Sequence, residues 1–243
     1  MSSFIGLFSV CWSTFGYANL RVSMTTLHTL NVFTALDGSE GNSLGVFLDG
    51  GAIAEEGRQT IAADLNYSET VFVDDLAAGL LQIYTPEDQL PFAGHPLVGT
   101  SWLIAQTQEH APEVLRPPAG DVPTWIENGA TWIRGRAEWS PDFDFIEIES
   151  AEQVAALTSP PGDVADGYCW AWEDEASGRI RSRNFLPSFG IQEDPATGSA
   201  AVALAAQFGR SIQITQGNGC VLDARLGAGG TVEVGGLVVL AGR

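Results

Sequence analysis

The chain has 243 residues, of which 45% are hydrophobic and 17% charged, as expected for a globular protein with one large domain or two modest ones. Its formal net charge of −19 argues against nucleic acid and anionic membranes as partners, because no basic stripe is present to neutralise phosphates. All eleven basic residues are arginines. Without a lysine, the chain cannot anchor pyridoxal phosphate as a Schiff base or form a Walker A phosphate loop.

The spacing of cysteines and histidines indicates neither a disulfide framework nor a metal site. No C-x-x-C pair occurs, and the histidines are widely separated along the chain (Cys11, Cys169, Cys220; His28, His95, His110). We therefore expect a cytoplasmic protein that uses no metal and no cofactor. The fairly apolar stretch over residues 3–17 lacks a basic start and is too short to span a bilayer, so we treat residues 1–23 as an extension outside the fold.

The elements of the first half begin after residue 24. Strands are expected at residues 27–33, 43–48, 69–73 and 80–85, and residues 53–65 have helical spacing with two glutamates in the first turn. A polar loop over residues 86–94 leads into an apolar helix from His95. A proline-rich connector over residues 111–123 is the best boundary. It divides the chain into half-domains at 24–118 and 119–243, and the last strands can pair back to the first half.

The second half is expected to repeat this order. After a hairpin at Asn128-Gly129, strands are predicted at residues 143–148, 167–173 and 179–186, with a short helix at 152–157. Residues 200–208, in which only Gln207 is polar, predict a helix buried on all sides. Strands at 211–215, 221–224, 231–234 and 237–240, separated by glycine turns, close the chain. We predict an α+β fold of two similar halves, each a mostly antiparallel strand barrel around a buried helix.

The two apolar helices begin alike. Pro91-Phe92-Ala93-Gly94-His95 precedes the first helix, and Pro195-Ala196-Thr197-Gly198-Ser199 precedes the second. A glycine-led helix start, capped by Thr197 or Ser199, offers free backbone N–H groups to an anion such as a carboxylate. An ordinary capped core helix is the alternative. The simplest account of the two copies is an internal duplication whose two helix starts face each other.

Three motifs together resemble the PhzF phenazine-biosynthesis-like family, namely residues 67–73, 90–96 and 193–200. Weaker similarities lie at residues 41–47, at 183–187 and at Gln216-Gly217. The resemblance implies the diaminopimelate-epimerase-like fold, with the active site between two halves, and isomerase chemistry that needs no pyridoxal phosphate. It implies catalytic roles for Glu69, His95 and Asp194, and substrate-binding roles for Gly94, Gly198, Ser199 and Asn42.

The residues themselves agree with a proton-carrying role for Glu69. Strand alternation places Glu69 on the face of Val71 and Val73, and Ser68 on the opposite face. A carboxylate on an apolar face has a raised pKa, which suits it to exchange protons near neutral pH. The alternative is a Glu69 exposed at the strand end. His95 could likewise be a structural histidine, and Asp194 a simple helix cap.

We therefore predict an isomerase that shifts a proton on, or epimerises, a small carboxylate-bearing metabolite by general acid–base catalysis. The alternative is a non-catalytic protein that binds a metabolite on the same fold. Related racemases carry a cysteine at each helix start, where this chain has His95 and Ser199, so a thiol pair is disfavoured. The expected partners are a small-molecule carboxylate and, as a possible assembly, a second copy in a homodimer, with no nucleic acid and no membrane.

Overall fold

The computed structural model describes residues 8–9, 25–109 and 111–242, so the expected extension over residues 1–23 lies almost entirely outside it. The helices are α1 (Glu55–Leu65), α2 (Gly94–Thr107), α3 (Ala151–Ala156) and α4 (Gly198–Phe208), and the short helical turns are η1 (Gly50–Ala52), η2 (Ala137–Trp139), η3 (Pro187–Phe189) and η4 (Ala228–Gly230). The strands are β1 (Phe8–Ser9), β2 (Thr26–Thr34), β3 (Asn42–Phe47), β4 (Glu69–Asp75), β5 (Leu80–Tyr84), β6 (Gln89–Leu90), β7 (Val114–Leu115), β8 (Val122–Glu127), β9 (Ala130–Arg136), β10 (Phe145–Glu147), β11 (Gly167–Asp174), β12 (Arg179–Leu186), β13 (Ile191–Asp194), β14 (Ile212–Gln216), β15 (Cys220–Leu226) and β16 (Thr231–Leu240).

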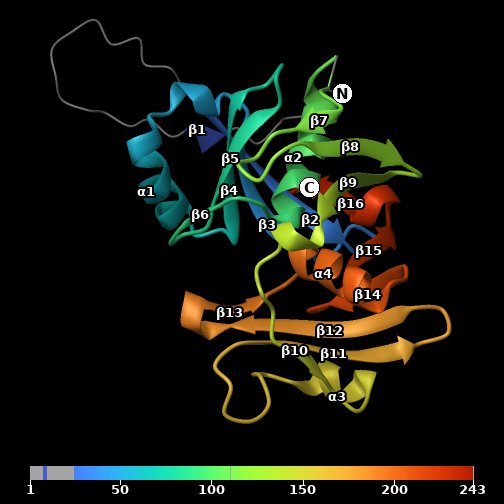
Figure 1. Cartoon of the computed structure of the whole chain (residues 1–243). Helices are drawn as coiled ribbons and strands as arrows, with labels where there is room; N and C mark the ends of the chain where they lie inside the picture. The colour runs from blue at the N-terminus through green and yellow to red at the C-terminus, as the bar shows by residue number, and fades with distance from the viewer. Residues whose placement is uncertain (1–7, 10–24, 110, 243) are drawn as a thin grey trace, which may run out of the picture.

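The strands of the described residues join into one mixed sheet, whose main path runs β10-β11-β12-β14-β15-β16-β2-β3-β4-β5-β6 (Figure 1). Strands β3 and β4 are parallel and connect through α1, β4 to β6 are antiparallel, and α2 follows. In the same order, β10 and β11 are parallel and connect through α3, β11 to β13 are antiparallel, and α4 follows. Helices α2 and α4 therefore occupy equivalent places in two successive runs of elements.

Most expected elements are confirmed to within a few residues. The β8–β9 hairpin turns at Asn128 and Gly129, whose φ angles of 52° and 83° are the positive values that this type of turn requires. Helix α4 is buried along most of its length, but not on all sides as expected, because Gln207 is exposed. The capping role expected for Thr197 is wrong, because its side chain makes no cap hydrogen bond and instead contacts Asp194.

The expected glycine turn between residues 234 and 237 is also wrong, because β16 is one continuous strand through Gly235 and Gly236. A Cβ at Gly235 would lie 2.4 Å from the ring of Trp132, and one at Gly236 would lie 2.6 Å from the ring of Phe33. The two glycines thus leave room for aromatic rings against the strand, and they do not form a turn. As a result, β16 pairs with β15 and β9 at its start and with β2 at its end.

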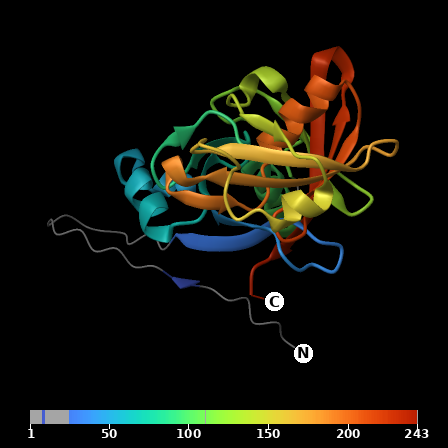
Figure 2. The same ribbon diagram turned by 90° about the horizontal axis from the view of Figure 1, so that it is seen from below.

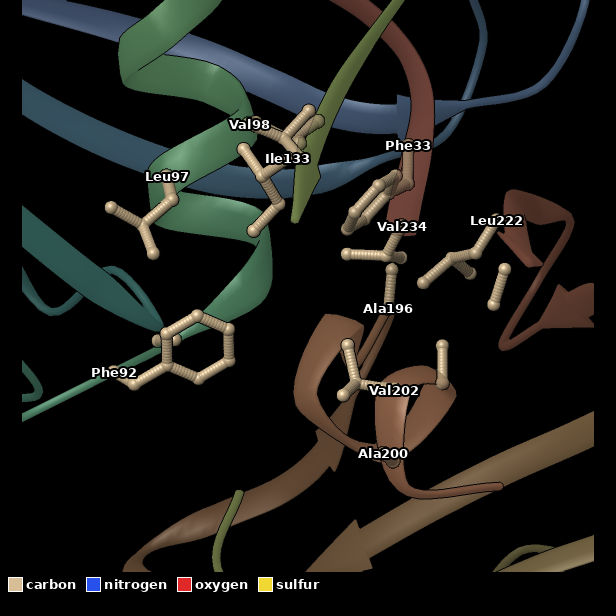
Figure 3. Close-up of a cluster of buried hydrophobic side chains, with 14 of the residues drawn as sticks. Phe33, Phe92, Leu97, Val98, Ile133, Ala196, Ala200, Val202, Leu222 and Val234 are labelled. Atoms are coloured by element: carbon tan, nitrogen blue, oxygen red, sulfur yellow. The ribbon is translucent and has the colours of Figure 1, made fainter. Parts of the chain in front are cut away.

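The main hydrophobic core lies around α2 and α4, which occupy the interior, whereas α1 lies at the outer edge in both overall views (Figures 1 and 2). Side chains of both helices meet there with side chains of the strands, as Figure 3 shows for Leu97, Val98, Ala200, Val202, Ile133 and Val234. Val71 and Val73 of β4 belong to this core, while Phe72 faces a smaller cluster that includes Ala62 of α1. The alternation predicted for β4 is therefore confirmed, and it directs the side of Glu69 toward the interior. Among the described residues, no helix is both long and apolar enough to cross a membrane.

Candidate active site

Glu69 and His95 face each other at the edge of the main core. Glu69 is the first residue of β4 and pairs with Leu44 of the parallel strand β3, and its side chain is only 15% exposed. His95 is the second residue of α2 and is 3% exposed. The distance from His95 Nε2 to Glu69 Oε2 is 3.2 Å. Neither atom makes a hydrogen bond of normal geometry within the described part of the chain.

Asn42 links these two residues to Asp194. Its side chain is fully buried at the start of β3. Asn42 Nδ2 donates to Asp194 Oδ1 at 2.6 Å and to the carbonyl oxygen of Ala196 at 2.9 Å, and it lies 3.4 Å from His95 Nδ1. The two shorter contacts use both amide hydrogens, so the His95 contact is a weak third one. The Oδ1 atom of Asn42 accepts from the hydroxyl of Ser68 at 2.9 Å.

Asp194 ends strand β13 and lies directly before the turn that opens α4. It is 8% exposed, and its Oδ2 atom accepts from the hydroxyl of Thr197 at 2.5 Å. Gln216 of β14 donates to the carbonyl oxygen of Asp194 at 2.8 Å. Both carboxylate oxygens of Asp194 are thus held by donors from the protein, whereas Glu69 Oε2 has no donor among the residues that the structure describes.

The starts of α2 and α4 meet at this site. A Cβ added to Gly94 would lie 2.7 Å from Gly198 Cα, and one added to Gly198 would lie 2.9 Å from Gly94 Cα. Ser199, the second residue of α4, is 9% exposed, and its carbonyl oxygen accepts from the hydroxyl of Ser140 at 3.0 Å. Within the described ranges neither helix has a side-chain cap, so first-turn N–H groups of both helices are available to an acceptor. The positive dipole ends of both helices lie at this one place.

Burial shifts the protonation of all three titratable residues. Burial raises the pKa of Glu69 well above its ordinary value, and the negative charge of Asp194 raises it further. Burial raises the pKa of Asp194 to about 6, although hydrogen bonds from Thr197 and Asn42 lower it. Burial lowers the pKa of His95 to about 3, partly opposed by a backbone hydrogen bond with Ser43. At neutral pH, His95 is therefore an uncharged imidazole, and it lies next to a carboxyl group whose pKa is raised.

The structure thus brings together every site residue expected from the sequence. Sequence reasoning assigned no site role to four more residues, although all four lie within the motifs named above (Ser68, Asn184, Thr197 and Gln216). The expectation that Ser68 faces away from the site is wrong, since it lies just before β4, where strand alternation does not yet apply.

A thiol also lies close to this site in space, although not in sequence. Cys220 Sγ accepts from the backbone N–H of Gly41 at 3.2 Å, beside Asn42. Burial raises the pKa of this thiol to about 11, which keeps it protonated and unreactive at neutral pH. Two surface cavities, of about 290 Å³ and 370 Å³, are lined by other residues. Within the described ranges, no cluster of three or more histidine, cysteine or acidic side chains could hold a metal ion.

Comparisons with known proteins give this geometry a context. A family model described as phenazine biosynthesis-like protein, PhzC-PhzF, matches residues 30–163 and 140–235. The chain is 32% identical over 227 residues to a trans-2,3-dihydro-3-hydroxyanthranilate isomerase of Pseudomonas chlororaphis, covering 73% of this chain and 81% of that protein. It is 29% identical to a protein named only as an uncharacterized isomerase in Deinococcus radiodurans, covering 87% of this chain and 86% of that one.

Two solved structures show the fold. A PhzF-family protein of Enterococcus faecalis superposes with a TM-score of 0.73 at 20% identity, covering 89% of this chain and 96% of that one. A hydroxyproline epimerase from Agrobacterium vitis superposes with a TM-score of 0.56 at 12% identity, covering 90% and 91% of the two chains. The fold is thus that of PhzF proteins and epimerases, a mixed sheet of many strands with few helices, and the chain is of the isomerase class. Within that class, it belongs to the PhzC-PhzF, phenazine biosynthesis-like family.

Proposed function

We propose that this protein is a cofactor-independent isomerase that moves a proton between two positions of a small carboxylate-bearing metabolite, with Glu69 as the proton carrier. The observation that carries the proposal is that Glu69 Oε2, which is buried and accepts from no donor in the described part of the chain, lies 3.2 Å from an uncharged His95. A carboxyl group whose pKa is raised toward neutrality can both give and take a proton at working pH.

The abutting helix starts at Gly94 and Gly198 support a role in holding negative charge. Backbone N–H groups and helix dipoles that already point at one place stabilise an anion without reorganising during the reaction. We propose that they bind the ligand carboxylate or the negative charge that develops when the proton moves, and that the Ser199 N–H belongs to the same set. Asp194 is proposed to act on the ligand through Glu69 and His95, since its own oxygens are already occupied.

For Asn42, the contacts favour a positioning role over the ligand contact expected from the sequence. Its buried amide donates both hydrogens to protein acceptors and accepts from Ser68. In the proposed mechanism Asn42 fixes the position of Asp194 relative to His95. The division into half-domains at residue 118 remains a prediction, as does the homodimer.

The test is solvent deuterium exchange, read by mass spectrometry. The purified protein is incubated in D2O with trans-2,3-dihydro-3-hydroxyanthranilate, the compound named for the Pseudomonas relatives, and with a panel of cyclic and amino-acid-like carboxylates. We expect deuterium uptake into at least one compound, with loss of that uptake in Glu69→Gln. Saturable binding of a compound that takes up no deuterium would instead support the non-catalytic alternative.

A further inference from the structure

The hydroxyl of Thr197 has only one acceptor to which it can donate its proton. Thr197 Oγ1 accepts from Asn184 Nδ2 and from Gln216 Nε2, each at 2.9 Å. A threonine hydroxyl has two lone pairs and one proton, so these two donors use its whole capacity to accept. Its proton must therefore go to Asp194 Oδ2 at 2.5 Å.

The backbone fixes the orientation of Gln216, which supports this assignment. Gln216 is fully buried, and its Nε2 atom donates to the carbonyl oxygen of Asp194 at 2.8 Å. Its Oε1 atom accepts from the backbone N–H of Thr197 and from the hydroxyl of Tyr168, each at 3.2 Å. A carbonyl only accepts and an N–H only donates, so a flipped amide would face two like groups. Gln216 must therefore donate to Thr197.

The consequence differs for the two carboxyl groups of the site. Asp194 accepts a hydrogen bond at each oxygen, from Asn42 and from Thr197, so a proton on either oxygen would displace a donor. Glu69 Oε2 has no such donor among the described residues. Two interacting buried carboxyl groups do not both ionise readily, and hydrogen bonds to the charged form select which one does.

We propose that Gln216 is a positioning residue, which through Thr197 keeps Asp194 the ionised member of this pair and leaves the shared proton on Glu69 in the free enzyme. This inference rests on the proposed function and adds the order of the two proton transfers. Glu69 meets the ligand as a donor, and its proton forms a C–H bond with the electron pair of a ligand double bond. The Glu69 carboxylate then takes a proton from another carbon, whose C–H electron pair becomes the new double bond. No other reactant is needed.

Four other titratable groups act on or contact the pair: His95 from α2, Tyr168 from β11, Glu193 from β13 and Cys220 from β15. Burial lowers the pKa of His95 and raises the pKa values of Tyr168 and Cys220, so these three groups are neutral at pH 7. Glu193 forms an ion pair with Arg183, and its negative charge disfavours ionisation of Asp194. The donors on Asp194 therefore work against both burial and a neighbouring charge.

The test is a carbon-13 NMR titration of protein labelled at the Asp and Glu carboxyl carbons, with signals assigned from Asp194→Asn and Glu69→Gln. At pH 7 we expect Asp194 to be ionised and Glu69 to be protonated. Thr197→Val keeps the side-chain shape but removes the hydroxyl, and should move the Asp194 midpoint up by about one pH unit. Thr197→Ser should restore the native midpoint. The matched control is Thr100→Val, at an equally buried threonine on α2 whose hydroxyl has no partner in the described chain.

A protonated Asp194 beside an ionised Glu69 at pH 7 would overturn the proposal, as would a Thr197→Val shift no larger than that of Thr100→Val. If Thr197→Val does not fold, the titrations of the native protein and of Gln216→Met test the proposal instead. Gln216→Met must then also raise the pH midpoint of Asp194. The titration uses no ligand, so it is independent of the deuterium-exchange test. A protein that exchanges no deuterium can still have its proton on Glu69 in the titration. A protein that does exchange deuterium can have it on Asp194 instead.

Discussion

Gly94 and Gly198 lie in direct backbone contact, with no space for a Cβ on either residue. Neither residue has a positive φ angle, so glycine is required here by the close approach of two helix starts and not by backbone strain. This contact determines how near the free N–H groups of α2 come to those of α4. The contact also brings close together the residues that follow the two glycines, His95 on α2 and Ser199 on α4.

Gly94→Ala should separate the two helix starts. The added methyl group would have to displace backbone atoms, and such overpacking typically costs about 1–3 kcal/mol of unfolding free energy. We expect a loss of that size in chemical denaturation and a fall of at least tenfold in deuterium exchange, since small displacements of catalytic groups cost rates of about this order or more. Gly57→Ala on α1, where the new methyl group has free space, is the control and should be neutral or stabilising. Equal effects of the two substitutions would contradict a special role for the contact.

Glu69→Gln should abolish most of the chemistry and leave the fold intact. The amide keeps the size of the side chain but cannot carry the proton, and general acid–base groups contribute about 10²- to 10⁴-fold. Stability at pH 7 should hold or rise, because a buried group with a raised pKa is replaced by a neutral one. Glu147→Gln, at an exposed glutamate on β10, should leave the rate of deuterium exchange unchanged. Near-native exchange by Glu69→Gln would transfer the proton-carrying role to another residue.

His95→Asn should change how stability depends on pH. The pKa of His95 is lowered from 6.5 to about 3 in the folded protein, so between these values the unfolded chain binds more protons than the folded one. His95 therefore contributes stability that is present above pH 6.5 and is lost as the pH falls toward 3. The loss is at most about 5 kcal/mol by linkage. Asp194 has a raised pKa, so its contribution to stability changes with pH in the opposite direction. Asp194 is present in both the native protein and the variant, so its contribution is common to both.

Urea denaturation of the native protein and of His95→Asn at pH 7 and pH 4 measures this difference. The native protein should lose more stability than the variant on acidification. Identical losses in the two proteins would mean that His95 titrates normally and is not desolvated.

Ser68→Ala tests the link between Ser68 and Asn42. Removing the hydroxyl leaves the fully buried Asn42 Oδ1 without its donor, which typically costs about 1–3 kcal/mol. We expect this loss in denaturation and a several-fold drop in exchange, because Asn42 then holds Asp194 less firmly. Ser177→Ala, which removes an exposed serine contact in a surface turn, should do neither. A fully neutral Ser68→Ala would show that Asn42 is positioned by its donor contacts alone.

The sequence by itself determined the order of elements, the hairpin at Asn128-Gly129 and the two similar helix starts. These features depend on local turn chemistry and on apolar periodicity, both of which are visible within a few residues. The family resemblance added the identities of the site residues. Strand alternation also directed Glu69 inward correctly, because Val71 and Val73 share its face.

Only the tertiary structure decided what surrounds those residues. Gln216 lies far along the chain from Asn42, and β16 reaches both β15 and β2 because rings from β9 and β2 pack on its glycines. The donors on Asp194 come from β3, from the turn before α4 and, through Thr197, from β12 and β14. Packing between segments far apart in the sequence brings these groups together, and the helix and strand propensities of single segments do not predict it. Burial at this meeting point raises the pKa values of both Glu69 and Asp194, and it is a property of the folded chain alone.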